Sequence, residues 1–279
     1  MDNNNMLTID LDKTVSDKSP KLYRMLPRFV MNYLKRIIRQ DDVNEILTLY
    51  GNEFCGLAFN RKVLEHLNIG YSIEGRENLP PADGRYIFVS NHPLGALDGI
   101  VLMDFIGEYY GKIQFVVNDI LMYLTPLREL FVPVNKHGRQ SADYVQLIDE
   151  LYASNKQVLY FPAGLCSRKI KGKITDLEWK KSFVTKAVKY ERDIVPLYFD
   201  GRNSNFFYNL ANLRKLVGIK ANLEMLYLSD EFFRKKNANF TIKAGEPVSY
   251  RRLAELGTKQ SIEYIREKVY GLNVAHGQG

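Results

Sequence analysis

The chain has 279 residues, of which 46% are hydrophobic and 25% are charged, values that are ordinary for a globular protein and exclude a chain disordered throughout. Its net charge of +7 favours anionic partners, such as nucleic acid, an anionic membrane surface or an acidic carrier protein. The two cysteines, Cys55 and Cys166, form neither a disulfide framework nor a metal-ligand spacing, so we expect a reducing, cytoplasmic setting.

The beginning of the chain is polar rather than basic or apolar. We therefore expect no secretory signal, and we expect residues 1–19 to form a loose arm. No window of the sequence approaches the roughly 20 apolar residues that a membrane-spanning helix needs.

Residues 18–40 contain seven Lys and Arg side chains and no acidic residue. Pro27 divides this segment, and Phe29, Tyr33 and Ile37 recur at helical spacing, which predicts a helix over 28–39 with one apolar and one basic face. Such a helix suits the surface of an anionic bilayer, to which each Lys or Arg adds about 1 kcal/mol. A helix that packs on the domain and shows its charges to water has the same pattern, and we favour membrane contact.

The remainder of the chain alternates between strand and helix patterns. Two helices are expected within 43–67, followed by a short strand at 70–75. Further strands are expected at 86–90, 113–117, 130–134, 157–161, 194–199, 222–228 and 240–245, and helices at 99–110, 140–153, 178–190 and 206–216. This alternation predicts an α/β fold with a mostly parallel sheet covered by helices.

The predicted organisation has four parts after the loose arm. They are a helical membrane-associating extension at 20–70, an α/β domain at 71–250, a closing helix at 251–270 and a frayed tail at 271–279.

The strand at 86–90 runs into Asn91, His92 and Pro93, and Asp98 follows His92 after five intervening residues. In open α/β sheets ligands bind outside the carboxyl ends of strands, which is where His92 is expected. A carboxylate beside a histidine holds its tautomer and leaves the far nitrogen free to accept a proton. Asp98 can equally cap the next helix, and His92 can be a hydrogen-bonded turn residue.

Three further apolar strands run into turns of ligand-binding character, at 130–136, 158–164 and 194–199. Gly164 allows a backbone to approach a ligand closely, and Arg168 and Lys169, which follow it, attract phosphate or carboxylate. Pro196 lies near the middle of the last strand, which is unusual away from sheet edges and bulges.

These four stretches, in this order, resemble the four blocks of the glycerolipid acyltransferase superfamily, whose members transfer a fatty acyl chain from a thioester to an acceptor hydroxyl. The family block Asn-His-x-x-x-x-Asp resembles Asn91 through Asp98, and the block Phe-Pro-Glu-Gly-Thr-Arg-Ser resembles residues 161–168. The second and fourth blocks resemble residues 131–136 and 194–197, and the likeness extends over about 71–245.

The resemblance implies that His92 is the general base and that Asp98 orients it. It implies no cofactor, a thioester of acyl carrier protein or coenzyme A as co-substrate, a lysolipid acceptor and no nucleic-acid partner. We expect a peripheral protein on the inner face of the cell membrane, attached to its anionic surface through residues 18–40. The candidate substrate-binding residues are Asn91, Lys136, Arg139, Phe161, Pro162, Gly164, Arg168 and Lys169.

Three departures from the family pattern bear on the acceptor. The spacing between His92 and Asp98 is one residue longer, Ala163 replaces a Glu, and Lys136 replaces an Arg. The longer spacing resembles a bacterial hemolysin-like branch that includes O-acyltransferases of ornithine and glycine lipids. The loss of the Glu and of the Arg disfavours a glycerol-phosphate acceptor and favours a lyso-amino-acid lipid. A 1-acylglycerol-3-phosphate acceptor and a non-catalytic lipid-binding relative are the alternatives. The distance between the His92 ring and the Asp98 carboxylate discriminates the last of these.

Two other residues attract functional interpretations that we disfavour. An acyl-cysteine at Cys166 is not needed by the chemistry of the family. Trp179, the single tryptophan, is expected to pack in the core, with lining of a substrate tunnel as the second interpretation.

Overall fold

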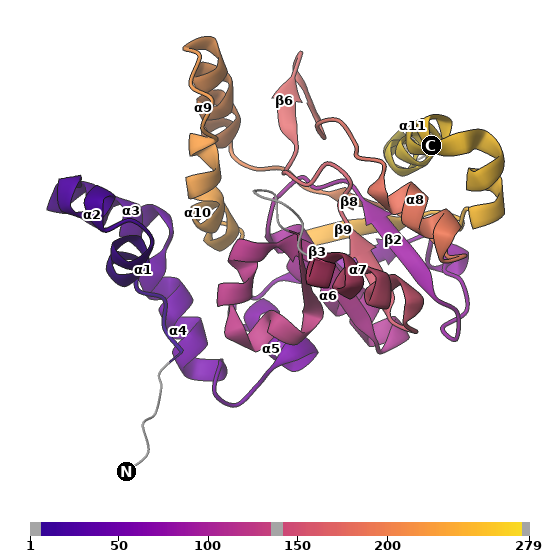
Figure 1. Ribbon diagram of the computed structural model, residues 1–279, viewed down its shortest axis with the longest axis horizontal. Helices are drawn as coiled ribbons and strands as arrows, with labels where there is room; N and C mark the ends of the chain where they lie inside the picture. The colour runs from indigo at the N-terminus through magenta and orange to yellow at the C-terminus, as the bar shows by residue number, and fades with distance from the viewer. Residues whose placement is uncertain (1–6, 135–141, 275–279) are drawn as a thin grey trace.

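The computed structural model describes residues 7–134 and 142–274. Its centre is a seven-stranded sheet with the order β1-β9-β8-β2-β5-β3-β4 (Figure 1). The strands are β1 (Gly70–Glu74), β2 (Tyr86–Ser90), β3 (Ile113–Asn118), β4 (Phe131–Val134), β5 (Gln157–Tyr160), β8 (Asp193–Asp200) and β9 (Asn239–Ala244). The two-stranded hairpin of β6 (Arg168–Ile170) and β7 (Lys173–Thr175) lies outside the sheet.

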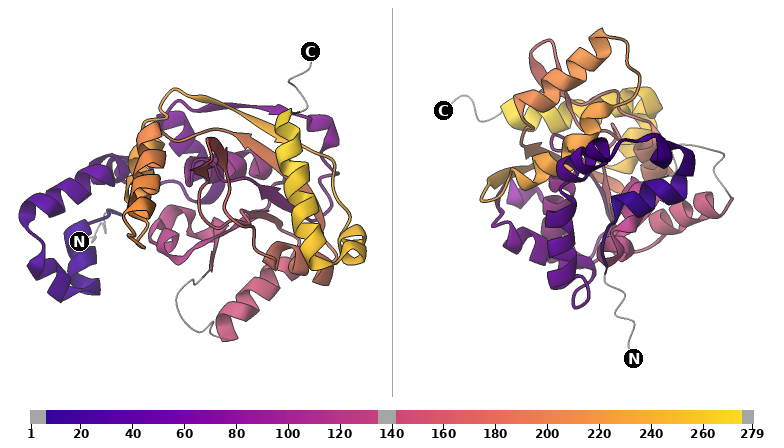
Figure 2. Two further views of the ribbon diagram at one scale, coloured as in Figure 1. Left: turned by 90° about the horizontal axis from the view of Figure 1, so that it is seen from above. Right: turned by 90° about the vertical axis from the view of Figure 1, so that its left-hand side faces the viewer.

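Five neighbouring strands, from β8 to β4, run parallel, whereas β9 pairs antiparallel to β8 and β1 runs parallel to β9. The mostly parallel sheet predicted from the sequence is therefore confirmed. Parallel strands need crossover connections, and the helices that provide them cover both faces of the sheet (Figure 2).

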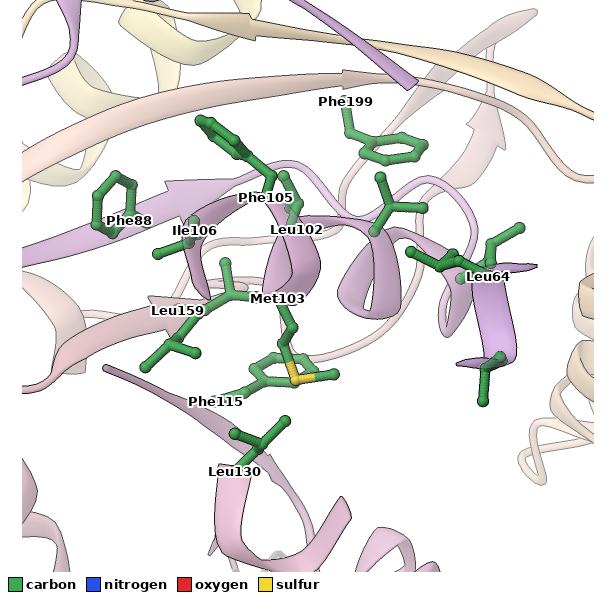
Figure 3. Packing of buried hydrophobic residues seen from close by; sticks show 14 of the residues in the cluster. Leu64, Phe88, Leu102, Met103, Phe105, Ile106, Phe115, Leu130, Leu159 and Phe199 are labelled. Atoms are coloured by element: carbon green, nitrogen blue, oxygen red, sulfur yellow. The ribbon is translucent and has the colours of Figure 1, made fainter. Parts of the chain in front are cut away.

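Alternation along β2 shows how the two faces are divided. Phe88 points into one buried cluster, with α6 (Leu97–Tyr110) and β3, whereas Ile87 and Val89 point into the other, with α8 (Ser182–Lys189) and α11 (Tyr250–Val274). Figure 3 shows the first cluster, in which Phe105 and Leu102 of α6 lie between Phe88 and Phe199. Because both faces are covered, β2 is almost entirely apolar, as the sequence pattern predicts.

The helices on the first face are α4, α5 and α6, and those on the second are α7, α8 and α11. The α-helices are α1 (Leu11–Lys18), α2 (Pro20–Met25), α3 (Arg28–Ile37), α4 (Gln40–Tyr50), α5 (Gly56–His66), α6 (Leu97–Tyr110), α7 (Ala142–Ala153), α8 (Ser182–Lys189), α9 (Asn205–Leu216), α10 (Leu228–Phe233) and α11 (Tyr250–Val274). The 3₁₀ turns are η1 (Arg76–Asn78), η2 (Asp119–Tyr123), η3 (Thr125–Leu130) and η4 (Leu223–Tyr227).

Pro196 lies inside β8 without breaking the sheet. Its carbonyl accepts from the Gly245 N–H, and the ladder between β8 and β9 begins only at Leu197, opposite Ala244. In a strand, the backbone N–H and carbonyl of one residue point to the same side. The position of the missing N–H of Pro196 therefore faces the chain just beyond the end of β9, where the ladder between β8 and β9 needs no donor.

The N-terminal part differs from the sequence prediction. The loose arm predicted at 1–19 is wrong for residues 11–18, which form α1. Asp10 caps this helix by accepting from the Lys13 N–H, and Asp12 pairs with Lys35 of α3. The extension predicted at 20–70 also ends too late, because α5 packs in the same buried cluster as α6.

Two other predicted elements are wrong. The strand expected at 222–228 is instead the 3₁₀ turn η4 followed by the start of α10, and its Glu224 is buried against two arginines. The closing helix predicted to end at Tyr270 continues to Val274 after a kink at Gly257, which has φ 74° and ψ 163°. The predicted frayed tail is therefore wrong for residues 271–274, and residues 275–279 lie outside the described part.

Candidate active site

The predicted histidine follows the end of the central strand β2. Its neighbour Asn91 is 3% exposed, donates from Nδ2 to the Phe199 carbonyl over 3.0 Å and accepts from the Phe199 N–H at Oδ1 over 2.7 Å. Both ends of the amide are thus used to join β2 to β8. Asn91 is therefore a clamp between two strands, and the prediction that it contacts substrate is corrected, because its polar atoms face the protein.

His92 and Asp98 are directly hydrogen-bonded. His92 Nδ1 lies 2.9 Å from Asp98 Oδ2, and the Asp98 side chain is completely buried. Asp98 also accepts from the backbone N–H groups of Leu94, Gly95 and Gly99. Since every partner of this carboxylate donates to it, the network assigns the His92 proton to Nδ1 and leaves Nε2 as an acceptor.

The extra residue between His92 and Asp98 does not separate the pair. Gly95 takes a left-handed conformation with φ 82°, and a Cβ placed there would lie 2.8 Å from the Cβ of Cys166. This turn brings Asp98 into the first turn of α6, where the helix dipole favours a negative charge. The alternative interpretation of Asp98, as the cap of the next helix, is not confirmed, because the N-cap of α6 is Ala96 and Asp98 lies within the first turn.

Phe161 lies against the histidine ring. It directly follows β5, and its ring stacks on His92 with 3.9 Å between centroids and 19° between planes. The other side of Phe161 contacts Phe115 edge-on. The imidazole, 12% exposed, is therefore held both by a carboxylate and by a fixed aromatic face.

The turn after Phe161 is shaped by backbone contacts. The Gly164 N–H donates to the Phe161 carbonyl, Gly164 has φ 61°, and the Pro162 carbonyl accepts from the Lys180 N–H. Ala163, which stands where the resemblance has a Glu, is buried among apolar residues of the second face.

A second buried carboxylate, Asp176, was not predicted from the sequence. It precedes α8 and accepts three hydrogen bonds, from the His92 backbone N–H over 3.1 Å, from Ser167 Oγ and from Trp179 Nε1 over 2.9 Å. Burial raises the pKa of this carboxyl, against the effect of its hydrogen bonds. Asp176 thereby joins the turn of His92 to the turn that follows β5.

The backbone of Asp176 is held in turn by α11. Its N–H donates to the hydroxyl of Tyr270, and its carbonyl accepts from Arg266. Trp179 packs edge-on against Phe183 in the core, as predicted, and also serves as a donor to Asp176. The only sequence signal for Asp176 is an Asp three residues before the single tryptophan, which does not reveal a contact with His92.

Arg168 is placed differently from the prediction. The side chain is 2% exposed, its Nη1 donates to the Cys166 carbonyl, and its Nη2 donates to Glu224 over 2.8 Å. Glu224 also accepts from Arg214 of α9. Arg168 is thus a buried cation that ties the turn after β5 to α9 and η4, and its prediction as a ligand of the acceptor head group is corrected.

Of the other predicted cations, Lys169 lies half-buried in β6, next to Arg168. Lys136 and Arg139 lie outside the described residues. A surface cleft of about 720 Å³, lined by Arg61, Tyr71 and Asp104 among others, opens between α5, β1 and α6, and none of the residues at the His92 turn lines it. Among residues 7–134 and 142–274 no cluster of three or more His, Cys, Asp or Glu side chains is arranged to hold a metal ion.

Comparison with known proteins decides what this site belongs to. Residues 13–279 match the acyltransferase family. The chain belongs to this family. It is 44% identical over 274 residues to the lyso-glycine lipid O-acyltransferase of Bacteroides thetaiotaomicron, covering 98% of this chain and 100% of that protein. It is 43% identical to the lyso-glycine lipid O-acyltransferase of Phocaeicola vulgatus, covering 98% of each.

The acyltransferase also resembles a solved structure. The 1-acyl-sn-glycerophosphate acyltransferase of Thermotoga maritima superposes with a TM-score of 0.51 and 17% identity over 90% of each chain. At this identity the likeness concerns the fold, and it agrees with the predicted α/β architecture. No helix within the described part of the acyltransferase is long and apolar enough to cross a membrane.

The network around Asp176 allows a first prediction. In the variant Asp176→Asn an amide nitrogen would face the Trp179 indole N–H, so that two donors oppose each other and the His92 turn shifts. We expect kcat to fall about 10–100-fold with little change in KM, because misplacement of a base affects the reaction more than binding. Steady-state kinetics of the folded variant provide the measurement.

The double variant Asp176→Asn/Trp179→Phe is the matched control, because it removes the opposing donor and is expected to regain part of the lost kcat. If the single variant raises KM and leaves kcat unchanged, Asp176 does not act by positioning His92. The same conclusion follows if the kcat of the double variant is no higher than that of the single variant.

Cys166 allows a second prediction. The thiol is buried, and burial raises its pKa to about 11, so it is protonated at neutral pH. We expect iodoacetamide to alkylate exposed Cys55 in the folded acyltransferase and to reach Cys166 only after denaturation, as measured by peptide mass spectrometry. Rapid labelling of Cys166 in the native protein would contradict this expectation and would reopen the interpretation of an acyl-cysteine.

Proposed function

We propose that the acyltransferase moves a fatty acyl chain from a thioester to the hydroxyl of a lyso-glycine lipid, with His92 as general base. The observation that carries the proposal is the hydrogen bond of 2.9 Å between His92 Nδ1 and Asp98, which leaves Nε2 as the acceptor nitrogen. High identity over nearly the whole chain to two proteins named lyso-glycine lipid O-acyltransferase supports the choice of acceptor.

In the proposed reaction, the hydroxyl oxygen of the acceptor attacks the carbonyl carbon of the thioester while His92 Nε2 takes the hydroxyl proton. The tetrahedral intermediate then expels the thiolate, which receives the proton from the imidazolium, so that an ester and a free thiol result. Asp98 stabilises the imidazolium that forms between these steps, and Phe161 keeps the ring in its plane. A thioester is already activated, so this route needs no covalent enzyme intermediate.

The head group of the acceptor carries a carboxylate in this proposal. Among the cations predicted to bind the acceptor, Lys169 is described and half-buried after the turn that follows β5, and Lys136 and Arg139 remain candidates from the sequence. Ala163 also favours an acceptor with a carboxylate head group. It lies among apolar residues, at the position where the family pattern associated with glycerol-phosphate acceptors has a Glu. Acylation of 1-acylglycerol-3-phosphate is the second candidate, and a non-catalytic lipid-binding role is disfavoured by the intact contact between His92 and Asp98.

The partners follow from charge. Acyl carrier protein and coenzyme A are both acidic, which suits a net charge of +7. We further propose that residues 18–40 attach the protein to the anionic inner face of the cell membrane. Met31 and Ile37 of α3 are buried, whereas Phe29 is 74% exposed and exposed Arg28 and Arg36 lie on the same helix.

The test is an assay with acyl carrier protein thioester and a panel of lyso-glycine lipid, lyso-ornithine lipid and lysophosphatidate, with products identified by mass. Diacylated glycine lipid as the main product is expected. Phosphatidate as the main product would instead support the second candidate, acylation of 1-acylglycerol-3-phosphate. The absence of every diacylated product, with thioesters of both acyl carrier protein and coenzyme A, would overturn the proposed function.

A further inference from the structure

Exposed apolar side chains are unevenly distributed over the described residues. Of the seventeen large apolar side chains that are exposed there, four lie at 22–33 on α2 and α3, and seven lie at 206–226, from α9 to η4. The sequence pattern predicts only the first group. In the second group, Leu216 is 84% exposed and Val217 is 59% exposed at the C-terminal end of α9. We call the exposed apolar side chains of residues 206–226 the α9–η4 surface.

The α9–η4 surface is connected to the N-terminal helices. Tyr227 at the end of η4 contacts both sides, because its hydroxyl is hydrogen-bonded to that of Tyr33 in α3, and its ring packs edge-on against Phe206 of α9 at 5.0 Å. Both views agree that α9 and α10 lie between α2–α3 and the sheet (Figures 1 and 2). The two groups of exposed apolar side chains therefore belong to adjoining elements.

The exposed charges within residues 201–226 have one sign. Between Gly201 and Leu226 the exposed charges are Arg202, Lys215 and Lys220, and the single acidic residue, Glu224, is buried against two arginines. Residues 18–40 have no acidic residue at all. A cationic rim around exposed Leu and Val matches an anionic bilayer, whereas two copies of the same surface would bring like charges together.

The α9–η4 surface is also attached to the catalytic turn. Asn203, just before α9, donates to the Leu94 carbonyl, and Leu228, just after η4, lies against Gly95 in the turn between His92 and Asp98. Cys166 contacts Met225 of η4. Whatever this surface binds is therefore held close to His92.

We propose that the α9–η4 surface is a second membrane-docking element, which inserts its Leu and Val side chains into an anionic bilayer beside α2 and α3 and holds the catalytic turn at the lipid surface. This rests on the proposed function, since a lysolipid with its acyl chain in the bilayer presents its hydroxyl at that level. It assigns membrane contact to a part of the chain for which the sequence predicts a helix at 206–216 but no contact with the membrane.

The first test is vesicle binding. In the triple variant Leu213→Gln/Leu216→Gln/Val217→Gln we expect affinity for vesicles of phosphatidylcholine and phosphatidylglycerol in equal parts to fall about 30-fold, measured by co-sedimentation. The control is Val145→Gln/Leu147→Gln on α7, which changes apolar side chains that are 45% and 40% exposed on a helix that packs against β4, and wild-type affinity is expected. Equal binding by the triple variant and the wild type would overturn the proposal.

The second test reads insertion directly. Trp179 is buried, so a new indole in Leu216→Trp dominates any change of emission when vesicles are added. Quenching of this indole by brominated lipid is expected, with no quenching in Leu147→Trp. If Leu216→Trp is not quenched and the triple variant instead changes the oligomeric state without lipid, the surface joins two copies of the chain and the proposal fails.

The outcome is separable from that of the proposed function. Turnover of detergent-dispersed lysolipid by the triple variant should equal that of the wild type, because no altered side chain contacts His92. Absence of turnover in both proteins would remove the proposed function alone, whereas normal turnover with normal vesicle binding in the triple variant would remove the docking surface alone.

Discussion

Replacing His92 with alanine is expected to lower kcat about 10²–10⁴-fold, the usual contribution of a general base, while the protein stays folded. Nε2 is the nitrogen left to accept a proton, because Nδ1 is bound to the buried carboxylate of Asp98 at 2.9 Å. The side chain is 12% exposed, and its ring is supported by Phe161. The measurement is the rate of diacylated product formation by mass, with circular dichroism to confirm the fold.

His66→Ala is the matched control, because His66 is a histidine of α5 whose ring contacts Tyr50, remote from the His92 turn. It should leave kcat unchanged. Asp98→Asn should also lower kcat, because the neutral amide no longer stabilises the imidazolium that forms when His92 takes the proton. Full activity of His92→Ala would contradict the mechanism, and a loss confined to KM would reduce His92 to a binding residue.

Replacing Glu224 with glutamine is expected to lower the free energy of unfolding by about 3–5 kcal/mol, the usual cost of breaking a buried ion pair. Glu224 is completely buried and accepts from Arg168 Nη2 over 2.8 Å and from Arg214 Nε over 2.8 Å. The neutral amide would leave two buried guanidinium groups without a counter-charge. Urea denaturation followed by circular dichroism provides the measurement.

Glu255→Gln is the control for that experiment. Glu255 pairs with Arg252 on α11, with both side chains largely exposed, and such pairs contribute at most about 1 kcal/mol. A comparable small effect of both substitutions would show that the contacts between Glu224 and the two arginines do not stabilise α9 and η4.

The catalytic turn illustrates how far local patterns extend. His92 was placed correctly because an apolar run that ends in Asn-His-Pro is a local signal, and the crossover rules of parallel sheets then locate it at a carboxyl edge. The distance to Asp98 was not predictable, because it depends on the left-handed Gly95 and on where α6 begins. The same limit applies to η4, whose composition predicts a strand, whereas the structure has a 3₁₀ turn in which buried Glu224 pairs with distant arginines.

The sequence by itself determined the parallel sheet, the turn that carries His92 and the basic amphipathic helix α3. Each of these is predicted by patterns of residues that are close together in the sequence. Only the tertiary structure decided that Asn91 binds Phe199, 108 residues away, that Asp176 holds the His92 backbone across 84 residues, and that Arg168 is buried against Glu224. It also decided which apolar side chains of α9 and η4 stay exposed. Burial and ion pairing depend on partners that are distant in the chain, so the local hydrophobic periodicity of the sequence does not predict them.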